Sequence, residues 1–301
     1  MVNEAAAGER RSKICTVTEA ITRFVPATCP SLVVGGMHLH NMPMALVREI
    51  VRQRAGRQIE TLIAGPAAGL GADLLIGAGL VREAIVSYIG LEHFGLAPAF
   101  RRAAAAGRPV IHDLDAFALL EAVRAGGAGL PLAVVLPGVA QTDLPAAPHS
   151  LYRQLPDPYR GGSAWVVPAI RPAVALISCQ EADAYGNGFF RGATFADRTL
   201  ALAADTVILL VEKIVDPAAA LKAPLAVGIP GFRVAAVVPV GFGCHPTSSH
   251  RYYNYDDVHI QTYQRLAATE AGFWDYVKRY CDEPASQDDY MNRVQEEEWQ
   301  R

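Results

Sequence analysis

The feature that most constrains the fold of this chain is an alternation of short apolar runs with amphipathic segments of helical period. Between the first two runs, the apolar residues of 46–51 fall on one helix face and the charged residues on the other. Short runs bounded by Gly, Pro or Asp are typical of strands buried on both faces. We therefore predict βαβ units in an α/β fold, an open, mostly parallel sheet with helices on both faces. The first five runs are 31–34, 60–64, 84–88, 109–113 and 132–136.

A second group of strands is predicted in the C-terminal half of the chain. Residues 141–163 separate the two groups and are rich in Pro and Gly, so a long loop is expected there. An aromatic segment, 252–263, leads into C-terminal helices. The runs of the second group are 164–167, 174–179, 206–212 and 234–239.

The two ends of the chain differ in composition from the middle. Thr16 followed by Glu19 is a capping-box pattern, which predicts a helix over 17–24. We expect residues 1–14 to be a flexible tail, 15–283 to be a single α/β domain and 284–301 to be a polar tail.

Charge and cysteine usage exclude several classes of function. The 301 residues carry a formal net charge of -3, which favours neither nucleic acid nor an anionic membrane as a partner. The five cysteines form no C-x-x-C pair, a usage that fits a reducing compartment. No signal peptide or long apolar stretch is evident. A cytoplasmic protein with no membrane or nucleic-acid partner is expected.

A glycine-rich turn follows the first predicted strand. Gly35 and Gly36 permit a tight turn and a close approach of the backbone to a ligand, although glycines also occur in ordinary turns. Pro43 opens the next helix, where unpaired N–H groups would suit an anion or a developing oxyanion. Gly69 and Gly71 lack the third glycine of a dinucleotide fingerprint, so an NAD site is not predicted.

Four further patterns stand out along the chain: Gly35-Gly36 with Pro43, 86–90 with 124–131, the 182–187 turn Ala-Asp-Ala-Tyr-Gly-Asn, and 243–249 with 252–256. Through these segments, residues 16 to about 280 resemble the alpha subunits of family I coenzyme A transferases. His38 and Asn41 stand where the 3-oxoacid enzymes of that family usually have glycine. The last segment is most similar to the glutaconate branch.

The resemblance implies a CoA thioester as substrate, no bound cofactor and an obligate partner. In this family the thioester is attacked by a glutamate of the beta subunit, and the carboxylate nucleophile divides a difficult exchange into two easier steps. The beta signature S-E-N-G is absent here, and the neighbours of Glu181 do not match it. The implied partners are a beta-type subunit, commonly in an α2β2 assembly, an acyl-CoA and a carboxylate acceptor.

Candidate site residues follow from the turn, the polar loops and the resemblance. His38 and His40 could recruit a metal or bind a carboxylate, but no metal site is predicted. His112 or Asp113, at the end of the fourth predicted strand, could assist catalysis, while Asp113 or Asp115 could instead cap a helix. The candidate substrate-binding residues are Gly35, Gly36, His38, His40, Asn41, Pro43, Glu92 and His245.

Three functions are compatible with the sequence. The first is the alpha subunit of an acyl-CoA:carboxylate CoA-transferase. The second is the alpha subunit of a CoA-thioester ring-opening hydrolase of steroid catabolism, because His112 and Asp113 lie near the position of a glutamate in that branch. The third is a non-catalytic subunit that binds CoA esters.

Overall fold

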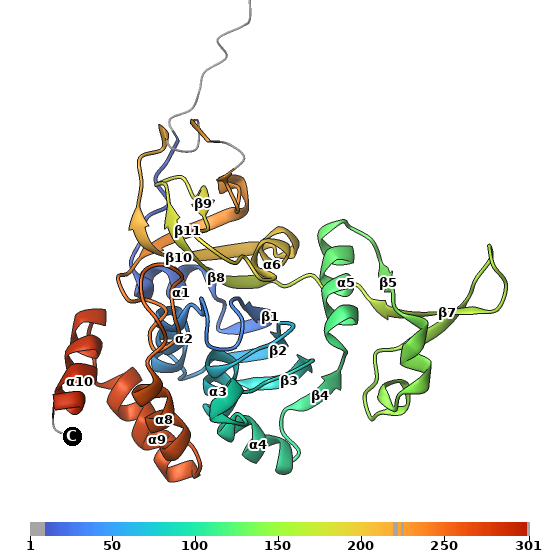
Figure 1. The fold of residues 1–301 in the computed structure, drawn as a ribbon, viewed down its shortest axis with the longest axis horizontal. Coiled ribbons are helices and arrows are strands. Elements are labelled where there is room, and N and C mark those ends of the chain that lie inside the picture. The colour runs from blue at the N-terminus through green and yellow to red at the C-terminus, as the bar shows by residue number, and fades with distance from the viewer. Residues whose placement is uncertain (1–9, 219–221, 224–225, 300–301) are drawn as a thin grey trace, which may run out of the picture.

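The main sheet is parallel and has the strand order β11-β10-β8-β1-β2-β3-β4, with β9 antiparallel to β8 at one end (Figure 1). The computed structural model describes residues 10–299 apart from 219–221 and 224–225. The prediction of an open, mostly parallel α/β sheet is confirmed. The strands are β1 (Thr28–Val34), β2 (Gln58–Ala64), β3 (Val81–Val86), β4 (Val110–Asp113), β8 (Val174–Ala182), β9 (Gly188–Phe189), β10 (Thr206–Ile214) and β11 (Val234–Pro239).

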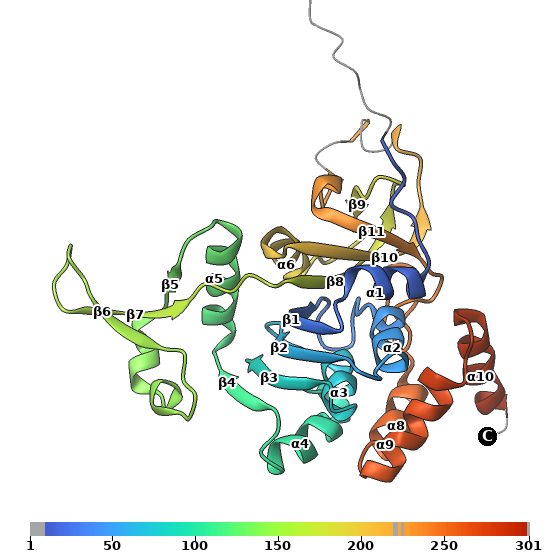
Figure 2. The ribbon, with the colours of Figure 1, turned by 180° about the vertical axis from the view of Figure 1, so that it is seen from behind.

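Helices cover both faces of this sheet, as Figures 1 and 2 show. One face packs on α1 to α4 and on the C-terminal helices, and the other on α5 and α6. The helices are α1 (Val17–Phe24), α2 (Met44–Arg52), α3 (Leu70–Gly77), α4 (Pro98–Ala105), α5 (Ala116–Gly127), α6 (Asp197–Ala203), α8 (Asp257–Leu266), α9 (Glu270–Val277), α10 (Gln287–Trp299) and the π-helix η6 (Lys278–Asp282). Short 3-10 helices are η1 (Glu92–Phe94), η2 (Pro137–Gln141), η3 (Leu144–Ala146) and η5 (Gly231–Arg233).

Two hydrophobic cores lie on opposite faces of the sheet because successive strand residues point to opposite sides. In β1, Leu32 and Val34 belong to the core beneath α1 and α2, whereas Val33 belongs to the core beneath α5 and α6. All three side chains are buried, with at most 5% of their surface exposed. This two-sided burial explains why the strands are apolar without alternation.

The capping box before α1 is confirmed. The Thr16 hydroxyl accepts a hydrogen bond from the Glu19 N–H at 3.2 Å, and the Thr16 N–H donates to the Glu19 carboxylate at 2.8 Å. The two bonds satisfy two backbone N–H groups that have no acceptor within the helix at its start.

An arm of three antiparallel strands projects from the body, and it corrects the prediction for this region. The run 132–136 contains a strand, β5 (Leu132–Val134), but it pairs with β7 (Ser163–Pro168) and not with the main sheet. The expected loop 141–163 includes η3 and a further strand, β6 (Arg153–Pro156). An apolar run predicts a strand without identifying its pairing partner, and here the run is only partly buried: Val134 is 61% exposed.

The ends of the described chain are attached to the body. Residues 284–301 were expected to be a polar tail, but α10 occupies Gln287–Trp299 and buries Tyr290 and Val294. These two side chains are four residues apart and therefore lie on one helix face. The segment looked like a tail because its charged residues outnumber these apolar ones. Near the other end, the Lys13 N–H donates to the Ala184 carbonyl at 2.8 Å. Residues 1–9 of the expected flexible tail lie outside the described residues, and the single-domain division stays a prediction.

None of the helices in the described part of the chain is both long enough and apolar enough to cross a membrane.

Candidate functional site

Three loops meet at the edge of the sheet where the parallel strands end. The loop after β1 contacts the loop after β2, because the His38 N–H donates to the Ala67 carbonyl at 2.9 Å. The loop after β2 contacts the loop after β3 through two bonds, from Ala68 N–H to the Tyr88 carbonyl at 3.0 Å and from Gly90 N–H to the Ala68 carbonyl at 3.1 Å. The carboxyl edge of an open parallel sheet is where such folds bind ligands.

The Gly35-Gly36 turn is held by a buried carboxyl group. The Gly36 N–H donates to Asp197 Oδ1 at 2.7 Å. A Cβ atom at position 35 would lie 2.6 Å from the same oxygen, and one at position 36 would lie 2.5 Å from the His40 carbonyl oxygen. Gly36 also has a φ of +85°, which side chains disfavour. The turn therefore requires glycine at both positions.

Asp197, at the start of α6, is a site residue that the sequence did not predict. It is completely buried, and burial raises the pKa of its carboxyl group to about 7. Its second oxygen, Oδ2, has no hydrogen-bond partner in the described structure. The signal was a single acidic residue in an otherwise mostly apolar helix, residues 197–203. Burial of such a group without an ion pair often marks a functional site.

The expected oxyanion site at Pro43 is wrong. The N–H groups of the first turn of α2 are already bonded: Met44 donates to the Met42 carbonyl and Ala45 to the Gly243 carbonyl, both at 2.8 Å, and Leu46 donates to the Pro43 carbonyl. Two of these acceptors are carbonyls of the same segment, and the third belongs to the distant loop at Gly243, which the sequence of one segment cannot reveal. The N–H groups of the preceding turn are also used, by the Leu176 carbonyl, Asp197, Ala67, Ser248 and Thr247.

His38 and Glu92 come together from two loops. His38 Nδ1 lies 4.0 Å from Glu92 Oε1, and the His38 ring contacts the Tyr88 ring with the two centroids 5.2 Å apart. The structure thus brings together two of the predicted site residues that are 54 positions apart in the sequence.

His40 and Asn41 have different roles in the same loop. His40 Nδ1 lies 2.8 Å from Ser248 Oγ, and its ring is flanked by aromatic rings. Asn41 is buried, and its Oδ1 accepts hydrogen bonds from Gln180 Nε2 and the His250 N–H. Asn41 therefore joins three segments of the chain, an arrangement in which its side chain faces protein.

His245 lies in the contact between α2 and the C-terminal segment. Its Nδ1 lies 2.8 Å from the Tyr290 hydroxyl, and its Nε2 lies 2.9 Å from Asp256 Oδ2. Both ring nitrogens have partners within the protein. The arrangement supports a packing role, and contact with substrate stays a prediction.

His112 and Asp113 lie on β4, the edge strand of the main sheet. Three strand spacings separate β4 from β1, a distance of about 14 Å. His112 Nδ1 lies 2.8 Å from the His149 carbonyl oxygen. Asp115 caps α5 by accepting the Ala118 N–H at 3.0 Å, so the capping alternative holds for Asp115. A catalytic role for His112 or Asp113 stays a prediction.

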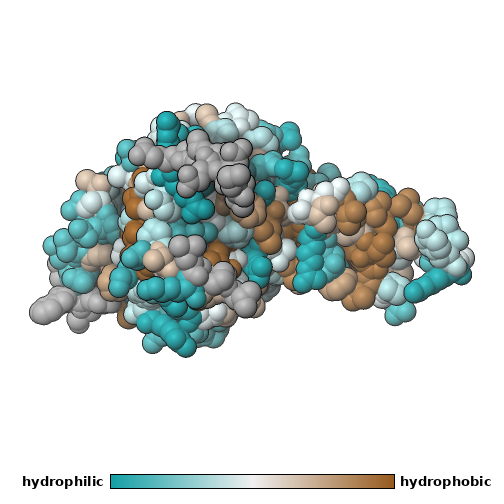
Figure 3. Space-filling view, turned by 90° about the horizontal axis from the view of Figure 1, so that it is seen from above, coloured by the Kyte–Doolittle hydropathy of each residue, from teal (hydrophilic) through white to brown (hydrophobic). Residues whose placement is uncertain are grey.

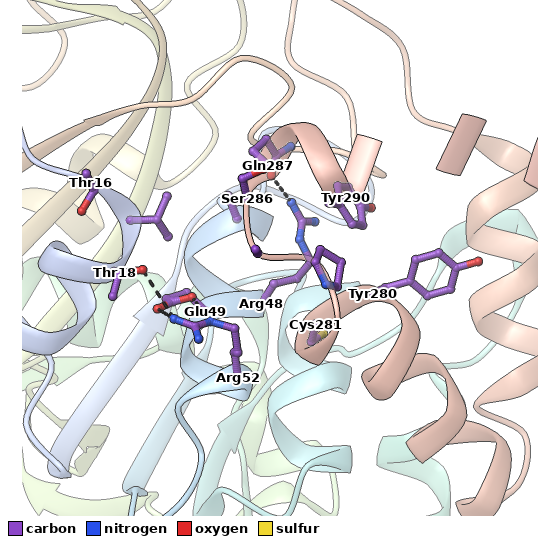
Figure 4. A pocket seen from close by; sticks show the side chains of 14 residues that line it. Thr16, Thr18, Arg48, Glu49, Arg52, Tyr280, Cys281, Ser286, Gln287 and Tyr290 are labelled. Carbon is purple, nitrogen blue, oxygen red and sulfur yellow. Dashed lines mark hydrogen bonds and ion pairs between the residues drawn. The ribbon is translucent and has the colours of Figure 1, made fainter. Parts of the chain in front are cut away.

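A cavity of about 310 Å³ lies on another part of the molecule, between α1, α2 and the C-terminal segment (Figure 4). The Arg48 guanidinium donates to the His245 carbonyl at 2.7 Å and to Gln287 Oε1 at 2.8 Å, and it lies over the Tyr290 ring. Glu49 and Arg52 form an ion pair. Of the charged groups around this cavity, Arg48 thus attaches α10, and Glu49 and Arg52 pair with each other within α2. All three have partners within the protein, which favours a packing seam over a ligand site.

Because Arg48 attaches α10 in this seam, we expect Arg48→Ala to lower the stability of the protein substantially. Loss of charged hydrogen bonds to one buried and one partly buried acceptor should lower the free energy of unfolding by about 3 kcal/mol. The matched control is Arg54→Ala, because Arg54 forms a partly exposed ion pair with Asp282 and should lose less than about 1 kcal/mol. Urea unfolding of the two variants measures this difference, and equal losses would contradict the assignment of the seam.

Among the described residues, no group of three or more His, Cys, Asp or Glu side chains is placed to hold a metal ion.

Comparisons with known proteins agree with this architecture. The sequence profile of the coenzyme A transferase family matches residues 18–239. The chain is 32% identical to an uncharacterized protein of Archaeoglobus fulgidus, over 93% of this chain and 61% of that protein, so it spans less than two thirds of that relative. It is also 32% identical to one of the subunits of the 3-oxoadipate CoA-transferase of Pseudomonas knackmussii, over 89% of this chain and 93% of that one.

A solved structure and a further relative extend the comparison. The crystal structure of glutaconate coenzyme A-transferase from Acidaminococcus fermentans superposes with a TM-score of 0.87 at 28% identity, covering 94% of this chain and 93% of that chain. One of the subunits of the cholesterol ring-cleaving hydrolase of Rhodococcus jostii is 26% identical over 87% of this chain and 89% of that protein. The resemblance found in the sequence is thereby confirmed, and the chain belongs to the coenzyme A transferase family.

Proposed function

We propose that this chain is the alpha subunit of a heteromeric CoA-transferase, which moves CoA between an acyl-CoA thioester and a carboxylate acceptor. The observation that carries the proposal is the Gly35-Gly36 turn, fixed by Asp197 at the carboxyl edge of the sheet. Two similar proteins are named as subunits of CoA-transferases, one for 3-oxoadipate and one for glutaconate. No bound cofactor is part of the proposal, because the thioester is itself the activated substrate.

The nucleophile in this proposal is a glutamate of a beta-type partner. Within this chain, Glu181 is ion-paired with Arg191 and accepts a hydrogen bond from the Tyr252 hydroxyl at 3.2 Å. Arg191 holds the pKa of the Glu181 carboxyl below its ordinary value, which weakens it as a nucleophile. Burial raises the pKa of the Cys244 thiol to about 12, so it too is a poor nucleophile near neutral pH.

The surface of the arm supports a partner chain. Apolar side chains gather on the projecting arm in Figure 3. Leu130, Val134 and Leu136 are each more than half exposed, and contiguous apolar surface of this kind is characteristic of protein interfaces. An α2β2 assembly and a cytoplasmic location, in keeping with the free cysteines, complete the proposal.

The substrate in this proposal lies against the turn and the loops beside it. Gly35, Gly36 and the start of α2 at Pro43 shape the backbone wall of the site. His38, His40 and Glu92 supply the polar side chains. Because the backbone N–H groups of the turn are bonded within the chain, the oxyanion donors would come from the beta subunit.

A second candidate function is a CoA-thioester ring-opening hydrolase. It is favoured by the similarity to part of a cholesterol ring-cleaving hydrolase, and it would use His112 or Asp113 as an acid or base. A beta partner without the nucleophilic glutamate would select it. Saturable acyl-CoA binding without turnover by the reconstituted complex would select a third function, a non-catalytic binding subunit.

The proposal predicts that neither subunit transfers CoA by itself. Purified separately, this chain and the beta-type subunit should each be inactive with acyl-CoA and acetate, and mixing them should restore acetyl-CoA formation. Mass spectrometry of the CoA esters measures the reaction. Transfer by this chain alone would refute a nucleophile on the partner.

A further inference from the structure

We propose that His38 and Glu92 form a proton-transfer pair, which removes and returns a proton at the carbon next to the thioester carbonyl of a bound acyl-CoA. The proposal rests on the proposed function, because it needs a CoA thioester against the Gly35-Gly36 turn. It is a separate reaction, since CoA transfer between carboxylates breaks no carbon–hydrogen bond.

The backbone holds both residues in an unfavourable conformation. His38 has a φ of 52° and Glu92 a φ of 51°, a left-handed region that disfavours most side chains by roughly 1–2 kcal/mol. Glycine would adopt either conformation freely. Strain of this kind persists where surrounding bonds impose it, and it gathers at functional sites. Here the bond from His38 N–H to the Ala67 carbonyl and the bonds of η1 impose it.

The two side chains are arranged as a base and its orienting carboxylate. His38 Nδ1 is buried without a hydrogen bond and faces Glu92 Oε1 at 4.0 Å. The side chains are 19% and 33% exposed, so the pair borders solvent. His38 Nε2 has no hydrogen-bond partner among the described residues. Closure around a substrate commonly shortens such contacts to hydrogen bonds.

Most other polar groups of the turn are bonded within the protein, so the His38 and Glu92 side chains are the ones left to react with a substrate. The backbone donors from Gly35 to Met42 are largely used within the chain, and Asn41 is buried against Gln180. The groups that face His38 are the Glu92 carboxylate and the Tyr88 ring. A turn whose backbone donors are largely used and whose imidazole is partly exposed is suited to proton transfer.

The proton transfer is balanced without a further reactant. With its proton on Nδ1, His38 accepts the α-proton of the acyl group on Nε2, and the electron pair of the broken C–H bond moves into the thioester carbonyl to give an enolate. The Glu92 carboxylate stabilises the resulting imidazolium. Return of a proton from Nε2 to the carbon restores the thioester.

Hydrogen exchange in D₂O tests the pair in the complex with the beta-type subunit. Butyryl-CoA and glutaryl-CoA are incubated with the complex, and deuterium at the α-carbon is followed by mass spectrometry beside CoA transfer to acetate. We expect exchange by the natural complex, a loss of at least about 100-fold in His38→Gly and roughly tenfold in Glu92→Gln. Added imidazole should restore exchange in His38→Gly, because glycine fits the backbone and leaves space for the base.

The control is Glu121→Gln on α5, since Glu121 forms an ion pair with Arg124 of the same helix; it should exchange like the natural complex. CoA transfer without α-deuterium in the natural complex would overturn the pair and leave the transferase intact. Parallel loss of exchange and transfer in His38→Gly, with no response to imidazole, would also overturn it by indicating a structural role. If the complex binds neither acyl-CoA, both the proposed function and the proton-transfer pair are contradicted.

Discussion

Gly36→Ala is expected to lower the free energy of unfolding by about 3 kcal/mol and to reduce CoA transfer by at least about 100-fold. The added Cβ would lie 2.5 Å from the His40 carbonyl oxygen, in a backbone conformation with φ +85°. Left-handed strain contributes about 1–2 kcal/mol, and crowding in a packed region about 1–3 kcal/mol. The rate of CoA transfer should fall as well as the stability, because a shift of about 1 Å in a positioning element is enough for a 100-fold loss.

Gly56→Ala is the matched control for this prediction. Gly56 has a similar φ of +72°, but a Cβ there meets nothing within 4 Å. Its free energy of unfolding should fall only by the cost of the left-handed conformation, about 1–2 kcal/mol, and its CoA-transfer rate should be unchanged. Urea unfolding and rate measurements on the two complexes compare strain alone with strain plus crowding. A Gly36→Ala complex as active as Gly56→Ala would contradict the role of the turn.

Asp197 should make the stability of the protein depend on pH. Its folded pKa of about 7 lies above the ordinary value of 3.8, so between these values the folded state binds more protons than the unfolded state. Stability contributed by this group is therefore complete below about pH 4 and is lost as the pH rises to about 7. Between pH 5 and pH 8 the loss should be about 3 kcal/mol.

Two variants isolate this effect. Asp197→Asn keeps an oxygen acceptor for the Gly36 N–H but cannot ionise. The stability difference between this variant and the natural protein should therefore shift in favour of the variant by about 3 kcal/mol as the pH rises from 5 to 8. Asp197→Leu also cannot ionise but leaves the buried N–H without an acceptor, so it should be less stable than Asp197→Asn by about 1–3 kcal/mol at every pH. Unfolding curves across this pH range measure both, and a natural protein with the same pH dependence as Asp197→Asn would contradict the buried ionisation.

The main sheet could be predicted because both of its faces are covered. Strands such as β1 and β10 are buried on both sides, so they are continuous apolar runs that can be recognised in a single sequence. The arm could not be placed in the same way. Its strand β5 has the same kind of apolar run, but pairing with β7 depends on the return of the chain through 141–163, where η3 and β6 interrupt the expected loop.

The site was predictable in part. The position of Gly35 and Gly36 after a strand and the approach of His38 to Glu92 both follow from the rule that parallel strands end at one edge. Asp197 could not be found, since its contact with Gly36 spans 161 residues and its burial depends on tertiary packing. The same limitation explains part of the error at Pro43, because the Ala45 N–H beside it is satisfied by a carbonyl from Gly243, about 200 positions away.

A CoA-transferase is tested most directly by co-expressing this chain with a beta-type partner and following the products of acyl-CoA plus acetate by mass spectrometry. We expect acetyl-CoA to form and, after borohydride treatment with acyl-CoA, a modified glutamate on the partner and none on this chain. Free CoA or a ring-opened CoA ester, formed without dependence on acetate, would contradict the transferase and indicate the hydrolase.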